Sequence, residues 1–160
     1  MAGRRYGWAV SQNGEQLHEY TASGQKVERV LAIMAHPDDV DFGAAGTIAT
    51  WTDRGIEVVY CLVTDGDAGG FDPSVPRSAI AGIRRNEQTA AAKRVGVTDL
   101  RFLGYPDGRL VPTLELRKDI SRVIRQVRPQ RVLTQCPQRN YSRIYASQDR
   151  KSTRLNSSHT

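Results

Sequence analysis

Short apolar runs rich in β-branched residues alternate with longer helical segments from Val27 onward. Four runs predict strands: Val27–Ala35, Ile56–Thr64, Leu100–Leu103 and Arg131–Cys136. Three intervening segments predict helices: Ala44–Arg54, Pro76–Val95 and Thr113–Val127. Gly55 and Gly96 follow the first two helices and Pro129 follows the third, and helices commonly end at such residues. The alternation is typical of a parallel sheet with crossover helices.

Right-handed crossovers convert this succession of elements into one architecture, an α/β, Rossmann-like, open doubly wound parallel sheet. The predicted strand order is 3-2-1-4, with the sheet incomplete on its C-terminal side. In that order the chain reverses direction between the first and fourth strands, and ligands bind at the carboxyl ends of the strands there. Three parts are predicted along the chain: an N-terminal extension at 1–26, the domain at 27–147, and a disordered, non-native tail at 148–160.

Composition is that of a soluble globular protein with one domain. The 160 residues are 39% hydrophobic and 25% charged, far from the values of disordered or collagen-like chains. The longest purely apolar run, Val30–Ala35, is much shorter than the about 20 residues that a membrane helix needs. No signal-peptide core precedes it, so we expect a cytoplasmic protein without a membrane span. Both cysteines, Cys61 and Cys136, adjoin apolar stretches and are expected to be buried thiols.

The formal net charge of +6 is concentrated in one segment. Residues 117–143 carry eight basic groups and one acid, Asp119. Arg122 and Arg125 lie three residues apart on a predicted helix, where a solvated face and a phosphate-binding stripe are both open interpretations. No aromatic residue is interleaved with the arginines of that helix to stack on bases. The pattern therefore favours the solvated face over a nucleic acid partner.

The loop after the first predicted strand concentrates the candidate chemistry. Residues 35–43, AHPDDVDFG, place one imidazole and three carboxylates within six positions. Clustered carboxylates repel one another, and such loops commonly hold a cation. The spacing of His36 and Asp39 lets a ring nitrogen and a carboxylate oxygen reach one zinc ion, while Asp38 remains free to accept a proton from water. The structural alternative is that the aspartates cap the following helix, although a cap needs only one acid.

Four motifs in this order resemble those of the PIG-L/LmbE-like N-deacetylases, zinc enzymes that remove acetyl groups from N-acetylglucosamine-type sugars. They are AHPDD at 35–39, TDGDAGG at 64–70, RRNE at 84–87 and FLGYPDG at 102–108. The resemblance covers about residues 27–147. It implies a hydrolase that uses zinc, or another divalent metal, on a small amino-sugar conjugate. His36 and Asp39 would bind the metal, and Asp38 would be the general base.

The resemblance also implies residues that bind the substrate. Arg84 and Asp107 would contact the sugar, and Asp67 is a weaker candidate for the same role. A structural alternative is open for each of them. Arg84 could form an ion pair with Glu87, and the two aspartates could be ordinary turn residues.

The C-terminal end departs from the family pattern. Family members supply a third zinc ligand and a second histidine from an HPDH-type motif after the fourth strand, but residues 148–151, QDRK, stand at that place. His159 lies on a polar tail and is not expected to replace the missing ligand. We therefore interpret the chain as truncated, and we expect weak zinc binding, little deacetylase activity and poor solubility.

Three other functions remain as alternatives. An acidic pair after a first strand is also typical of Mg²⁺-dependent phosphotransfer domains, although that interpretation leaves His36 without a task. The segment 117–143 could instead bind nucleic acid, with the steep salt dependence of phosphate contacts. An incomplete site on an unfinished sheet could also be an inactive fragment. The sequence does not indicate an oligomeric state.

Overall fold

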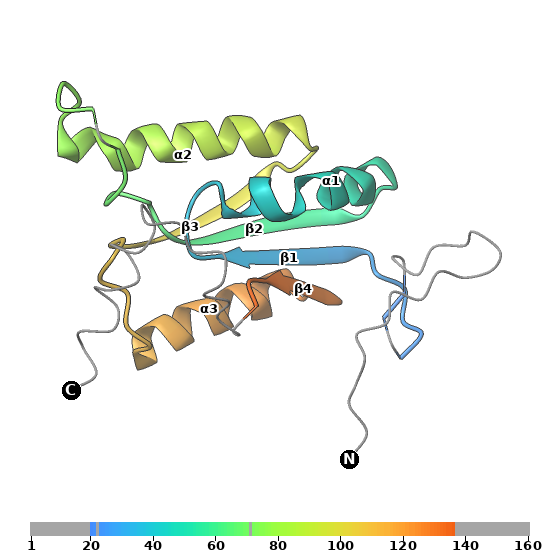
Figure 1. Ribbon diagram of the computed structural model, residues 1–160. Helices are drawn as coiled ribbons and strands as arrows, with labels where there is room; N and C mark the ends of the chain where they lie inside the picture. Colours follow the sequence, from blue (N-terminus) through green and yellow to red (C-terminus); the bar gives the residue numbers. More distant parts are fainter. Residues whose placement is uncertain (1–19, 22, 71, 137–160) are drawn as a thin grey trace, which may run out of the picture.

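Four parallel strands form one sheet that three helices cover (Figure 1). The computed structural model describes residues 20–21, 23–70 and 72–136. The strands are β1 (Arg29–Met34), β2 (Glu57–Thr64), β3 (Asp99–Tyr105) and β4 (Arg131–Thr134), and the helices are α1 (Asp39–Asp53), α2 (Arg77–Arg94) and α3 (Leu114–Val127). The strand order is β3-β2-β1-β4, with every pair parallel. This confirms the predicted α/β fold and its strand order.

Helices on both faces of the sheet explain why its central strands are continuous apolar runs. In Figure 1, α1 and α2 lie on one face and α3 lies on the other. Alternate residues of β2 supply the two cores. Val58, Tyr60 and Leu62 belong to the core shared with α1 and α2, whereas Val59 and Cys61 belong to the core shared with α3. One strand therefore anchors both layers.

The start of α1 differs from its prediction. The helix begins at Asp39 rather than at Ala44, so most of the acidic motif lies on its first turn. Within that turn Val40 is fully buried and Phe42 is 90% exposed. This amphipathic turn is hidden in the sequence because the acidic residues around it mask the helical period.

The two cysteines have different environments, and the prediction of two buried thiols is wrong for Cys136. Cys61 lies in β2 and has no exposed surface, whereas Cys136 is exposed. The physical reason is the length of β4, which ends at Thr134. Cys136 therefore lies past the end of the strand instead of within it.

β4 is an edge strand of the described sheet. It pairs with β1 over four residues, and no other strand in the described part of the chain pairs with it. Val132 on this strand is 45% exposed. An exposed edge with an apolar side chain is a surface to which other chains can add.

Some predictions fall on residues that are not described. The extension at 1–26 is described only from Tyr20, which forms an isolated antiparallel bridge with Lys26. The tail at 148–160, including His159, lies outside the described residues. Among the helices that are described, none combines the length and the apolar character needed to cross a membrane.

Candidate active site

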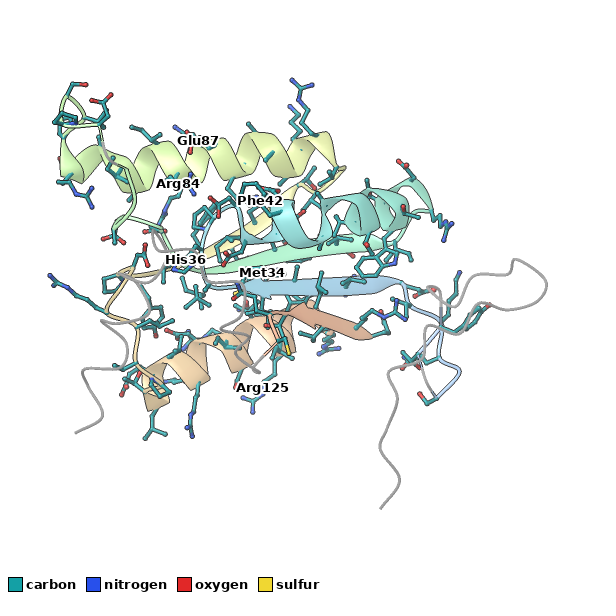
Figure 2. All side chains as sticks on the ribbon, viewed as in Figure 1. Met34, His36, Phe42, Arg84, Glu87 and Arg125 are labelled. Atoms are coloured by element: carbon teal, nitrogen blue, oxygen red, sulfur yellow. The ribbon has the colours of Figure 1, made fainter. Side chains whose placement is uncertain are left out.

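The loops after β1, β2 and β3 line a cavity of about 460 Å³ at the carboxyl edge of the sheet. The cavity combines carboxylates with His36, Arg84 and an apolar wall that includes Ile80 and Ile83. Figure 2 shows His36 at the end of β1, with Arg84 and Glu87 on α2 above it. The cavity therefore lies over the carboxyl ends of β1, β2 and β3, next to the reversal point between β1 and β4 where ligands bind in such sheets.

His36 has a carboxylate at each ring nitrogen. Nδ1 lies 3.3 Å from Asp39 Oδ2, and Nε2 lies 2.8 Å from Asp107 Oδ1. The backbone N–H of His36 also donates to Asp39 Oδ2 at 2.8 Å. Asp39 comes from the same loop, whereas Asp107 follows β3. Two separate loops therefore fix the orientation of the imidazole ring.

His36 and Asp39 have the spacing of two ligands on one zinc ion. Atoms bound about 2.0–2.2 Å from a tetrahedral zinc lie about 3.3–3.6 Å from each other, and His36 Nδ1 lies 3.3 Å from Asp39 Oδ2. Asp107 is at hydrogen-bond distance from the other ring nitrogen, where zinc-binding histidines commonly donate to a carboxylate. A catalytic zinc normally takes three protein ligands. Within the described residues, no group of three His, Cys, Asp or Glu side chains could hold a metal.

The electrostatics of this cluster couple His36 to its acidic neighbours. The hydrogen bond with Asp39 raises the pKa of His36, although burial of the ring opposes the rise, and Asp107 adds to it. Burial acts to raise the pKa of Asp39, but hydrogen bonds from His36 and from Gln135, just past β4, lower it overall. Each partner therefore stabilises the charged form of the other.

Asp38 occupies the N-cap position of α1, yet its side chain makes no cap hydrogen bond. Its backbone is left-handed, with φ 81° and ψ −22°, a conformation uncommon for residues other than glycine. The side chain is 45% exposed, lines the cavity and accepts a hydrogen bond from Arg84 Nη2 at 2.6 Å. The capping alternative therefore does not describe Asp38.

Arg84 connects α2 to the loop after β1. It donates to Asp38 Oδ2 at 2.6 Å, to the Pro37 carbonyl at 3.1 Å and to Glu87 Oε2 at 3.1 Å. The ion pair with Glu87 that the sequence left open is thus present, but it is one of three contacts. Because Arg84 also lines the cavity, a bound molecule would meet its guanidinium.

Asp107 and Asp67 adjoin each other but differ in their access to the cavity. The Asp107 side chain is 7% exposed, lines the cavity and bonds to His36. Asp67 Oδ1 accepts the backbone N–H of Asp107 at 2.8 Å, and Asp67 does not line the cavity. The structure therefore brings Asp107 into the site and leaves Asp67 as a support for the loop after β3.

Several residues that hold the loops were missed by sequence reasoning. Arg77 donates to three backbone carbonyls of the loop after β2, and Arg85 binds Asp65 through two nitrogens, at 2.9 and 2.8 Å. Gln88 is 2% exposed and contacts the loop after β1. The available signal was spacing on α2, because Arg77, Arg84 and Gln88 are separated by seven and four residues and share a helix face.

Comparison with known proteins finds relatives of one kind. The diacetylchitobiose deacetylase of Thermococcus kodakarensis is 43% identical over 111 residues, which cover 69% of this chain and 42% of the relative. The probable N-acetyl-alpha-D-glucosaminyl L-malate deacetylase 2 of Bacillus cereus is 36% identical over 114 residues, which cover 68% of this chain and 52% of the relative. The chain thus spans about half the length of these curated relatives.

A solved structure and a family model agree with these relatives. The N,N'-diacetylchitobiose deacetylase from Pyrococcus horikoshii, complexed with its inhibitor MPG, has a TM-score of 0.70 and 34% identity, covering 82% of this chain and 49% of that one. The PIG-L family model, described as GlcNAc-PI de-N-acetylase, matches residues 31–148. The match covers well over half of the chain, which therefore belongs to the PIG-L family.

Proposed function

We propose that this chain belongs to a metal-dependent N-deacetylase. The enzyme hydrolyses the acetamide of an N-acetylglucosamine-type sugar conjugate. The proposal depends on one observation: His36 and Asp39 have the spacing of zinc ligands beside Asp38, a carboxylate that caps no helix. Deacetylases among the relatives support the same class of reaction. The names of these relatives specify different sugar conjugates. We therefore propose a class of substrate and no single compound.

His36 and Asp39 are the residues proposed to hold zinc or another divalent ion. When bound, the metal would polarise the acetamide carbonyl and activate a water molecule for attack. Asp107 is proposed to orient the His36 ring, because its carboxylate is 7% exposed and already accepts from Nε2 at 2.8 Å. This differs from the sugar contact that the resemblance implied for Asp107.

Asp38 is proposed as the general base. Its carboxylate accepts a proton from the attacking water as the water oxygen bonds to the acetamide carbon. The carbon–nitrogen bond then breaks, a proton goes to the departing nitrogen, and the products are acetate and a free amino sugar. Arg84 fixes one oxygen of Asp38, so the base has its orientation before the substrate binds.

The sugar is proposed to bind between Arg84 and the apolar wall of the cavity. A pyranose ring presents hydroxyl groups at its edge and apolar C–H groups on its faces. Arg84 can donate to the hydroxyl groups, whereas Ile80 and Ile83 offer an apolar surface to a ring face. Asp67 is proposed to act only through the loop that carries Asp107.

Acetate release from N,N'-diacetylchitobiose tests the proposal on the protein expressed from its full reading frame. Chelation should abolish the release, and added zinc should restore it. Asp38→Asn should lower turnover by about 10²–10⁴-fold, the usual contribution of general base catalysis. The zinc content of this variant should equal that of the wild type, because the base is not a ligand.

The matched control is Asp53→Asn, the same substitution at the exposed far end of α1, which should leave turnover and zinc content unchanged. Loss of zinc in parallel with activity in Asp38→Asn would make Asp38 a ligand and would contradict its role as base. Absence of acetate release from the zinc-loaded wild type would reject the proposed reaction on this substrate.

A further inference from the structure

Gln88 is a buried polar residue in a helix whose other polar side chains are mostly in contact with solvent. Its side chain is 2% exposed, and burying an amide is costly unless its hydrogen bonds are satisfied. Both ends of the amide are used. Oε1 accepts the backbone N–H of Asp38 at 2.5 Å, and Nε2 donates to Asp41 Oδ1 at 3.4 Å. The residue lies outside all four sequence motifs, so no motif accounts for it.

The backbone of Asp38 is the part of the loop that most needs such a partner. With φ at 81° it adopts a conformation that L-residues avoid. Its carbonyl accepts the N–H groups of Asp41 and Phe42 at 2.9 and 3.3 Å, on the first turn of α1. Its own N–H donates to Gln88. The first turn of α1 therefore holds the carbonyl of Asp38, and the amide of Gln88 holds its N–H.

Gln88 and Arg84 lie one turn apart on α2 and hold Asp38 at two points. Arg84 bonds to the carboxylate at 2.6 Å, and Gln88 bonds to the backbone N–H. The geometry points to Gln88 as a positioning residue for Asp38: it maintains the left-handed backbone from which the carboxylate reaches the cavity. This inference rests on the proposed role of Asp38 as general base.

Amide hydrogen exchange on the 160-residue chain tests the inference without any assay of the reaction. Gln88→Met keeps most of the volume of the side chain and removes both hydrogen bonds. The Asp38 N–H should exchange at least about 10-fold faster in this variant, because its acceptor is lost. Amide groups of residues 90–92, in the same helix, should exchange as in the wild type. Thr89→Ala, which removes a hydroxyl that donates to the Arg85 carbonyl at 2.7 Å, is the matched control and should change neither.

Steady-state kinetics on the protein from the full reading frame gives the second readout. Gln88→Met should lower kcat by about 10–100-fold, with KM and zinc affinity within about 2-fold of the wild type, because the base is displaced while the sugar and metal contacts remain. Gln88→Glu keeps an oxygen that can accept the Asp38 N–H. Because it also loses the donor to Asp41, it should exchange the Asp38 N–H more slowly than Gln88→Met does, but faster than the wild type.

Each outcome bears on the inference separately from the proposed function. Unchanged exchange at Asp38 in Gln88→Met, or an equal rise along all of α2, would show that Gln88 only fills the core, and would overturn the inference. Should Gln88→Met fail to fold, complete loss of Asp38 protection in folded Gln88→Glu would overturn it. If the wild type releases no acetate, the proposed reaction fails while the exchange result still decides whether Gln88 holds Asp38. Normal kcat in an active Gln88→Met enzyme would reject the inference alone.

Discussion

Two roles have been given for Asp107: contact with the sugar and orientation of His36. Its short contact with Nε2 and its low exposure favour the second. We predict that Asp107→Ala weakens zinc binding by about 10–100-fold, because the ring loses the acceptor that fixes its orientation. Zinc titration of the 160-residue chain with a competing chelator measures the change.

The control for this prediction is Asp72→Ala. Asp72 lines the same cavity and bonds within its own turn to Ser74, so its loss tests the effect of removing a nearby negative charge alone. Zinc affinity in this variant should stay within about 3-fold of the wild type. Equal weakening in both variants would show that charge, and not the orientation of His36, controls the affinity.

The two thiols should differ sharply in reactivity. Burial raises the pKa of Cys61 to about 11, and the thiolate is the reactive form, whereas Cys136 is exposed. At pH 8 the native chain should react with one equivalent of a thiol reagent such as DTNB within minutes, and with a second only after denaturation. Cys136→Ser should remove the fast phase, and fast modification of both thiols in the native chain would contradict the burial of Cys61.

At this scale the sequence could indicate local partners but not distant ones. The three-residue spacing of His36 and Asp39 is a local property, and the two side chains do adjoin. The contact between His36 and Asp107 depends on β3 lying two strands away from β1, which no local pattern contains. Gln88 was missed for a related reason: its spacing places it on the helix face of Arg84, but it does not indicate that the side chain is buried.

Among the elements, the C-terminal ends of α1 and α2 approach each other closely at Gly96. This residue has φ 77°, and a Cβ atom there would lie 2.9 Å from the Cβ and Oγ1 atoms of Thr52. We predict that Gly96→Ala lowers the free energy of unfolding by about 2 kcal/mol, because it adds backbone strain to a steric clash. Urea denaturation followed by circular dichroism measures the change.

Gly82, inside α2, is a glycine whose replacement by alanine should stabilise the chain. A Cβ atom at this position on α2 meets no atom within 4 Å, and glycine inside a helix is less favourable than alanine. Gly82→Ala should therefore raise the free energy of unfolding by about 0.5–1 kcal/mol. A loss of stability in Gly82→Ala would mean that this face of α2 is covered.

The existence and order of the elements were predictable, whereas some of their boundaries were not. β2 has seven buried residues in succession, a pattern that only a strand covered on both faces explains. β3 is half-buried along most of its length and runs from Asp99 to Tyr105, so its apolar signal covers only the middle of the strand. The end of β4 at Thr134 was missed because the first residue that breaks a strand, Pro137, comes only after Cys136.

For the whole molecule, β4 predicts self-association, because no other strand among residues 20–136 pairs with its outer edge. Val132 is 45% exposed on that strand, and a charged residue on an edge strand discourages pairing with other chains. Val132→Lys should reduce the concentration-dependent light scattering of the chain. Val111→Lys makes the same change at a 55% exposed position outside the sheet and should have little effect. An equal reduction in both variants would assign the effect to net charge.

The partnership of His36 with Asp107 joins residues that lie 71 positions apart in the chain. Ribosomes add about 5–20 residues per second, so His36 is synthesised roughly 4–14 s before Asp107. During that interval the acidic loop exists without the strand whose end carries the partner of its imidazole. A metal ion captured then would meet a histidine with no fixed orientation. The order of translation therefore favours formation of β3 before the proposed metal binds at His36.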